Sequence, residues 1–260
     1  MSVSEPLEIQ PNGLIPRLEE VTPTAWDPAN ADMHGIFGQN SRDIRSRSFN
    51  LLRSRVLKLL DAKGWQSFAV VSATPGSGKS FIASNLAVAL SRTADRIVYL
   101  FDFDLRRPSL ADVFGLPIEH TINEFLTGEI ESLHSVAKRL GDEKLLIFPS
   151  SPRQEATSEL LSSVRMTELA AELKNLPRNV LCVVDLPPVF ANDDAAIVTA
   201  KLDSYLFVIE EGRTTKTQVK ESMNILAPAV CMGTVLNRYF KGLIADDYGY
   251  GGEAYGDYYR

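Results

Sequence analysis

The segment 73–80 constrains this chain more than any other, because it reads as a loop that holds nucleotide phosphates. An apolar run precedes it and a run with helical spacing follows it, which is the strand–loop–helix context of a Walker A motif. Ala73 stands where the pattern usually has glycine, and alanine is small enough for that position. The segment therefore predicts nucleotide binding. The alternative is a plain glycine turn with an exposed Lys79.

Each residue type in this loop has a chemical reason to be there. Gly76 and Gly78 let backbone N–H groups close on phosphate oxygens without a Cβ in the way. Lys79 would reach the β- and γ-phosphates, and the Ser80 hydroxyl would ligate Mg²⁺. A dinucleotide site is excluded, because the third glycine is missing. The residues expected to contact the nucleotide are Thr74, Pro75, Gly76, Ser77, Gly78, Lys79, Ser80 and Phe81.

Composition is that of a soluble globular protein. The chain has 260 residues, of which 45% are hydrophobic, and a net charge of −6, which argues against nucleic acid as the main partner. No apolar stretch approaches the ~20 residues that span a bilayer, and the N-terminus lacks the pattern of a signal peptide. Cys182 and Cys231 show no paired spacing, so we expect reduced thiols in the cytoplasm.

Three regions differ in composition. Residues 1–40 are rich in proline without a sustained apolar period, and we expect a disordered arm. Residues 41–241 have the patterning of a folded domain with a leading basic helix. Residues 242–260 are rich in glycine and tyrosine, and we expect a flexible tail.

The leading helix is basic and amphipathic. Its apolar residues recur at helical spacing, at Phe49, Leu52, Val56, Leu59 and Leu60. We expect the apolar stripe to face the core and the basic side to face solvent. The alternative is a surface for self-association or for anionic membrane lipids.

Strand-like and helical segments then alternate. Strands are predicted at 67–72, 97–102, 144–148, 180–185, 204–210 and 231–236, and helices at 79–92, about 155–175, 192–200 and 214–226. Near-continuous apolar strands are typical of a parallel sheet covered on both faces. The pattern predicts one α/β domain with a doubly wound, mostly parallel sheet.

Acidic residues end two of these predicted strands. Asp102 and Asp104 follow one strand, and Asp185 ends another. Open α/β sheets place their ligands at the carboxyl ends of the strands, where Asp185 could hold Mg²⁺. We expect the side chains of Asp102 and Asp104 to point in different directions, so that one faces the metal and the other an incoming acceptor. For a single aspartate, a turn or helix cap is the common alternative.

In combination, these motifs resemble the bacterial tyrosine kinases, which have a P-loop NTPase fold of the ParA/MinD-like branch. The segment 102–106 looks like the family's second Walker-type motif, and 185–188 looks like its Walker B motif. The stretches 156–163 and 233–238 are also similar to family sequence. The resemblance covers roughly residues 45–240.

The resemblance implies a protein-tyrosine kinase that uses ATP and Mg²⁺. It implies catalytic roles for Lys79, Asp102, Asp104 and Arg106, magnesium contacts from Ser80, Asp102 and Asp185, and a contact near the adenine from Asn237. It also implies a homo-oligomer in the cytoplasm that is recruited to the inner face of the membrane. The implied recruiting and activating partner is a membrane co-polymerase of capsular polysaccharide or exopolysaccharide.

The tail carries a cluster of tyrosines between glycines. Five of the eight tyrosines lie there, at Tyr248, Tyr250, Tyr255, Tyr258 and Tyr259. Family members phosphorylate such a cluster, usually in a neighbouring subunit, so these are the expected phosphoacceptors. The alternative is a disordered terminus that is no substrate.

The chain departs from the family pattern at one motif, and three other functions are alternatives to the kinase interpretation. The family's Glu-x-x-Arg-x-x-Arg assembly motif aligns with Arg47, Asn50 and Arg53, so only the last residue matches. A ParA/MinD-type switch ATPase would have a lysine at Thr74, and an iron–sulfur carrier ATPase would have a cysteine pair. A catalytically weak regulator that uses ATP to dock a membrane partner is the third rival.

Overall fold

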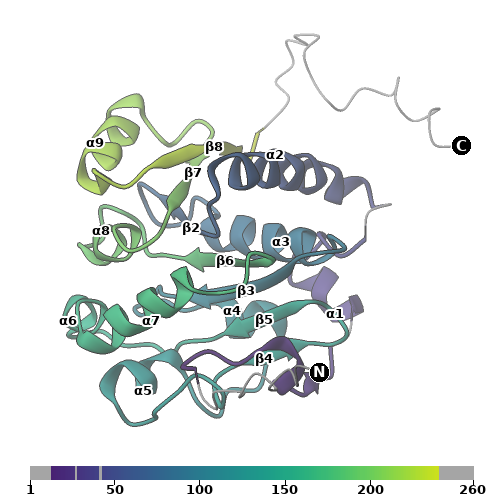
Figure 1. Ribbon diagram of the computed structural model, residues 1–260. Coiled ribbons are helices and arrows are strands. Elements are labelled where there is room, and N and C mark those ends of the chain that lie inside the picture. Colours follow the sequence, from purple (N-terminus) through teal and green to yellow (C-terminus); the bar gives the residue numbers. More distant parts are fainter. Residues whose placement is uncertain (1–12, 27, 41–42, 240–260) are drawn as a thin grey trace, which may run out of the picture.

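The computed structural model describes residues 13–26, 28–40 and 43–239, and within them eight strands form one sheet (Figure 1). Their order across the sheet is β1-β4-β5-β3-β6-β2-β7-β8. The strands are β1 (Pro23–Thr24), β2 (Ser67–Ser72), β3 (Ile97–Asp102), β4 (Lys138–Leu140), β5 (Leu145–Phe148), β6 (Val180–Asp185), β7 (Ser204–Glu210) and β8 (Cys231–Asn237).

The sheet is parallel except where β4 meets β5. Every residue of β2 and β6 is buried, as expected for strands covered on both faces. The parallel pairing brings the carboxyl ends of β2, β3 and β6 to one edge, and Asp102 lies directly opposite Asp185 in the ladder. The predicted doubly wound fold is confirmed, and all six predicted strands are present.

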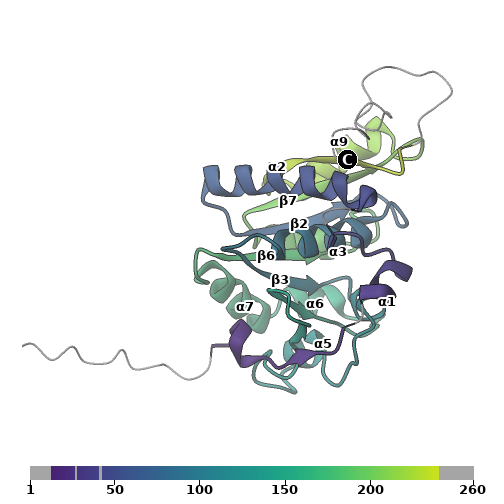
Figure 2. The ribbon, with the colours of Figure 1, turned by 90° about the vertical axis from the view of Figure 1, so that its right-hand side faces the viewer.

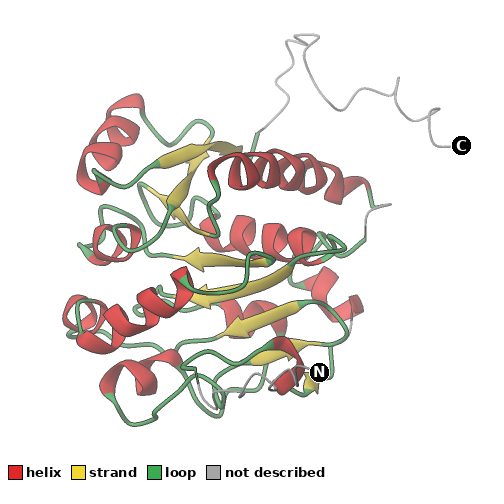
Figure 3. Ribbon diagram, viewed as in Figure 1, coloured by secondary structure: helices red, strands yellow, loops and turns green. Residues whose placement is uncertain are grey.

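Helices cover both faces of the sheet (Figure 3). They are α1 (Pro28–Met33), α2 (Arg47–Lys63), α3 (Lys79–Ser91), α4 (Leu110–Phe114), α5 (Ile122–Thr127), α6 (Thr157–Leu161), α7 (Val164–Lys174), α8 (Asp194–Thr199) and α9 (Lys216–Leu226). Buried side chains of α2, α3 and α4 belong to one apolar cluster, and those of α5, α7 and α8 to the other. In this described part of the chain, no helix has the length and apolar character needed to cross a membrane.

The basic helix α2 lies alongside α3 (Figures 1 and 2). Phe49, Val56 and Leu60 are buried, which confirms the core-facing stripe, whereas Leu59 is 38% exposed. The helix ends at Gly64, whose left-handed φ of 68° suits glycine.

One predicted helix is two in the structure. The segment expected as a single helix over about 155–175 forms α6 and α7, separated at Ser162 and Ser163. Ser163 has extended backbone, and its side chain accepts a hydrogen bond from the Met166 N–H. A serine that caps a new helix start therefore interrupts the apolar period.

Residues 13–26 and 28–40 are folded onto the domain, so the expectation of a disordered arm is wrong for them. Ile15 and Val21 lie in the main core, and β1 extends the sheet beside β4. The apolar residues here lack a period because they enter the core at separate places rather than from one helix face. Residues 1–12 of the arm lie outside the described residues.

A buried asparagine holds the second part of this arm on α3. The Asn85 side chain accepts hydrogen bonds from the N–H groups of Phe37 at 2.6 Å and Gly38 at 3.0 Å, and donates to the Gly35 carbonyl at 2.9 Å. Backbone approaches backbone closely here: a Cβ on Gly38 would lie 2.4 Å from the carbonyl oxygen of Asn85.

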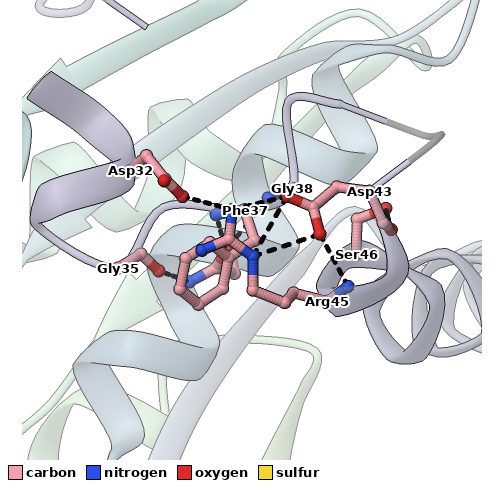
Figure 4. Close-up of polar contacts among 8 residues, drawn as sticks. Asp32, Gly35, Phe37, Gly38, Asp43, Arg45 and Ser46 are labelled. Atoms are coloured by element: carbon pink, nitrogen blue, oxygen red, sulfur yellow. Dashed lines mark hydrogen bonds and ion pairs between the residues drawn. The ribbon is translucent and has the colours of Figure 1, made fainter. Parts of the chain in front are cut away.

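An arginine ties the same segment to the start of α2 (Figure 4). The Arg45 guanidinium lies 4.2 Å from the centre of the Phe37 ring and forms ion pairs with Asp32 and Asp43. Because Arg45 is about half exposed, we expect these contacts to direct the chain more than to stabilise it.

We predict that Gly38→Ala lowers the free energy of unfolding by about 1–3 kcal/mol, because its methyl group would overlap the α3 backbone. The arm would also detach, so limited proteolysis should cut within 28–40 faster than in the unmodified protein. Met33→Ala, at a side chain that is 77% exposed in the same segment, is the control and should change neither. Equal stability and equal cleavage of Gly38→Ala would contradict the docking of this arm.

Candidate functional site

The phosphate loop, residues 73–80, connects β2 to α3 at the carboxyl edge of the sheet. Gly76 and Gly78 have left-handed φ values of 80° and 88°, which other residues rarely adopt. The Ser77 hydroxyl donates to the Thr74 carbonyl at 3.0 Å, which closes the loop on itself. A Cβ on Gly76 would meet nothing within 4 Å among the described residues, so no other part of the described chain covers the loop at this position.

The end of β8 contacts this loop. The Asn237 amide donates to the Ser77 carbonyl at 2.9 Å, and a Cβ on Gly78 would lie 2.2 Å from the Asn237 side-chain nitrogen. Gly78 therefore permits both the left-handed turn and the close approach of Asn237. The structure places Asn237 beside the loop, while its expected contact with adenine stays a prediction.

Lys79 is the cationic centre of the site. Its ammonium lies 2.8 Å from the Asp104 carboxylate, and the two side chains are only 12% and 5% exposed. Burial disfavours the charged ammonium, but the carboxylates of Asp185 and Asp104 outweigh it and raise the pKa of Lys79. Lys79 is therefore held charged and beside the loop that would present phosphates to it.

Asp102 and Asp104 differ in what they contact, although residues two apart on a strand share a face. Asp102 is the last residue of β3, and Asp104 lies beyond the strand. Asp104 reaches Lys79, whereas the Asp102 carboxylate accepts hydrogen bonds from backbone N–H groups of Ser109 at 2.9 Å and Leu110 at 3.0 Å. Burial, followed by the nearby charge of Asp185, raises the pKa of Asp102 to about 8. Asp102 thus fixes the turn into α4, and its expected magnesium contact stays a prediction.

Asp185 is the buried carboxylate that can accept a metal. It is fully buried, and neither of its side-chain oxygens has a hydrogen-bond partner among the described residues. Burial raises the pKa of Asp185, although Lys79 and the neighbouring Ser80 hydroxyl act to lower it. Mg²⁺ in phosphate-transfer sites takes one or two protein oxygens and completes its shell with water and phosphates. Asp185 and Ser80 fit that requirement.

The remaining residues that the sequence predicts for the site lie in different surroundings. Thr74 and Pro75 lie in the loop itself, but the Phe81 ring packs edge-on against Phe37 and Phe49, so only its backbone can face a nucleotide. Arg106 points its Nε toward Thr157 at 3.3 Å. The five tail tyrosines lie outside the described residues.

A buried carboxylate near Arg106 was missed in the sequence. Asp194, at the start of α8, lies 3.8 Å from the Arg106 Nε and is fully buried. Its sequence context resembles an ordinary helix start, and only the fold brings it to Arg106. One sequence feature could have pointed to Asp194: it follows shortly after Asp185, the end of a strand at the edge where ligands bind.

Comparisons with known proteins agree with this geometry. A ParA family model, described as NUBPL iron-transfer P-loop NTPase, matches residues 65–226. Tyrosine-protein kinase YwqD of Bacillus subtilis is 30% identical over 204 residues, which are 77% of this chain and 82% of that protein. Tyrosine-protein kinase etk of Escherichia coli K12 is 32% identical over 174 residues, and the match spans only 23% of that longer protein.

Solved structures give the same picture. The kinase domain of Escherichia coli tyrosine kinase ETK superimposes with a TM-score of 0.72 at 29% identity, covering 84% of each chain. The chimerical protein CapA2B2 has a TM-score of 0.71 at 25% identity, covering 87% of this chain and 96% of that one. MinD of Pyrococcus horikoshii, complexed with Mg-ADP, has a TM-score of 0.58 at 22% identity and shares the fold.

We predict that Lys79→Met lowers the free energy of unfolding of the nucleotide-free protein by about 3 kcal/mol, as measured by urea titration at pH 8. The substitution leaves Asp104 and Asp185 buried without their cation. Adding Asp104→Asn should restore part of the loss, because one uncompensated charge is then removed.

The matched control is Lys58→Met on the exposed side of α2, which should change stability by less than about 0.5 kcal/mol. If Lys79→Met unfolds at the same urea concentration as Lys58→Met, the ammonium does not hold these carboxylates together.

Proposed function

We propose that this chain, which belongs to the bacterial tyrosine kinases within the ParA-type P-loop NTPases, transfers the γ-phosphate of ATP to tyrosines of its own tail. The observation that supports this most is the buried ion pair of Lys79 and Asp104 beside the phosphate loop. Under this proposal Lys79 would bind the phosphates and Asp104 would act as the general base, at a distance of one hydrogen bond from each other.

Each residue of the site has a separate role in this proposal. The phosphate loop and Lys79 would hold the β- and γ-phosphates, and Asn237 would support the loop from β8. Ser80 and Asp185 would hold Mg²⁺, which when bound neutralises charge on the transferring group. Asp102 would help to orient this edge through its bonds to the start of α4.

Asp104 is the proposed base. A tyrosine hydroxyl has a pKa of about 10, so it is a poor nucleophile at neutral pH until its proton is accepted. Asp104 could accept that proton as the oxygen attacks the γ-phosphorus and ADP leaves with the bonding electron pair. In the nucleotide-free protein Asp104 is paired with Lys79, and the arrival of phosphates would draw Lys79 away and free the carboxylate.

The proposed acceptors are the tyrosines of the C-terminal tail, Tyr248, Tyr250, Tyr255, Tyr258 and Tyr259. The described part of the chain ends at Tyr239, two residues after Asn237, whose side chain contacts the phosphate loop. The acidic residues between the tyrosines complement Arg106 and Arg107 at the strand edge. Following the family resemblance, we propose transfer to the tail of a neighbouring copy in a homo-oligomer.

The cellular role is also proposed from the resemblance. The enzyme would act in the cytoplasm, recruited to the inner face of the membrane by a co-polymerase of capsular polysaccharide or exopolysaccharide. The cytoplasmic segment of that partner would activate it, and phosphorylation of the tail would regulate polymer length and export.

A nucleotide-switched ATPase is the second candidate, because the fold is shared with MinD. That class has an early lysine in the phosphate loop, where this chain has the partly exposed Thr74. Iron transfer has less support: Cys182 on β6 and Cys231 on β8 are separated by β2 and β7, so they form no pair for a cluster. The kinase proposal accounts for Asp104, which the switch proposal does not require.

We predict that incubation with ATP and Mg²⁺, with and without the partner's cytoplasmic segment, adds phosphate to tail tyrosines, as measured by mass spectrometry. Lys79→Met should abolish the signal. Asp104→Asn should slow transfer by at least about 10²-fold without weakening ATP binding, because the base is lost and Lys79 remains.

Lys58→Met is the control and should phosphorylate its tail like the unmodified chain. Hydrolysis of ATP with an unmodified tail would favour the switch ATPase. ATP binding with neither hydrolysis nor transfer, even with the partner segment, would favour the catalytically weak regulator.

A further inference from the structure

Arg106 is anchored in the structure by one of its three guanidinium nitrogens. Its Nε lies 3.3 Å from the Thr157 hydroxyl and 3.8 Å from the Asp194 carboxylate. Among the described residues, neither terminal nitrogen of Arg106 has a hydrogen bond. The side chain is 38% exposed, and Arg106 follows Asp104 by two residues in the chain.

The direction of the hydrogen bonds around Thr157 is fixed by chemistry. The Thr157 hydroxyl lies 3.2 Å from Asp194 Oδ1, and a carboxylate can only accept, so the hydroxyl must donate to it. The same hydroxyl oxygen then accepts from the Arg106 Nε–H. The hydrogen bonds thus run in one direction, from Arg106 to Thr157 and from Thr157 to the buried carboxylate of Asp194.

Asp194 is the fixed end of this series of hydrogen bonds. It also accepts from the Ser158 hydroxyl at 2.7 Å and the Asn192 amide at 2.5 Å, so the start of α6 and the loop before α8 meet at this carboxylate. Ala156, just before Thr157, has a left-handed φ of 55°, a strained backbone conformation for a residue other than glycine. The strained turn presents Thr157 and Ser158 together to Asp194.

We propose that Asp194 and Thr157 are positioning residues, which hold Arg106 by its Nε so that its terminal N–H groups engage an anion at the transfer site. The anion is an oxygen of the transferring phosphoryl group, which would accept from this fork. This inference rests on the proposed kinase function. It assigns no covalent step to Asp194.

The test is a double-mutant cycle on tail phosphorylation at saturating ATP. Thr157→Val keeps the shape of the side chain but removes the hydroxyl, and should lower the transfer rate by about 10-fold or more while the Kd for ATP stays within about twofold. Thr157→Ser should recover most of the rate. In an Arg106→Ala background, Thr157→Val and Asp194→Asn should cause no further loss.

Thr167→Val, an exposed threonine on α7, is the matched control and should transfer like the unmodified chain. Thermal melting accompanies every variant, and a loss of rate counts only where the variant is folded at the assay temperature. Losses of Thr157→Val and Arg106→Ala that simply multiply would show a role in folding the edge and would overturn the proposal.

A second readout needs no activity. The Arg106 Nε–H signal in a ¹H–¹⁵N NMR spectrum should be slow to exchange with water in the unmodified chain and in Thr157→Ser, and fast in Thr157→Val. An unmodified chain that transfers no phosphate but shows the protected signal would contradict the kinase function and keep the anchor. Equal exchange in all three chains would overturn the anchor itself.

Discussion

The charge on Lys79 is the interaction on which the rest of this site depends. Three carboxylates, of Asp102, Asp104 and Asp185, lie within its electrostatic reach, and all three are buried. Burial favours the protonated form of such carboxylates, and their mutual repulsion adds to it, so the pKa of Asp102 is raised. A single ammonium 2.8 Å from Asp104 offsets part of that repulsion, and a polyphosphate with its metal would compete for the same cation.

The sheet order explains why these groups meet. β2 carries the phosphate loop and lies next to β6, which ends in Asp185, and β6 lies next to β3, which ends in Asp102. Parallel pairing puts all three carboxyl ends at one edge, with Asp102 and Asp185 at the same level of the ladder. A slip of one residue would turn Asp185 to the other face of the sheet, so the site is as strongly specified as the register of its core strands.

Sequence patterns predicted those parts of the structure in which local and global preferences coincide. The strands of the central sheet are continuous apolar runs, and the phosphate loop combines a strand, two glycines and a helix. The sequence pattern alone therefore predicts both the strands and the loop. The short strands β1 and β4 could not, because two or three residues carry no period and exist only by pairing with each other and with β5. Asp194 was missed for a related reason, since its partner Arg106 is 88 residues away in the chain and is brought near by the sheet.

The folded arm bears on how copies of this chain could assemble. Arg53 is the one residue that matches the family's assembly motif, and here its guanidinium donates to the Ala89 carbonyl on α3 at 3.3 Å. Arg92, at the end of α3, donates a hydrogen bond to the Gly38 carbonyl of the arm. Burial is the larger cause that lowers the pKa of Arg53, and the positive charge of Arg92 is the smaller one. A guanidinium has several N–H donors, so this bond leaves others on Arg53 for a neighbouring copy. In this chain, therefore, Arg53 contributes to the packing of α2 on α3, and a contact with another copy would use its remaining donors.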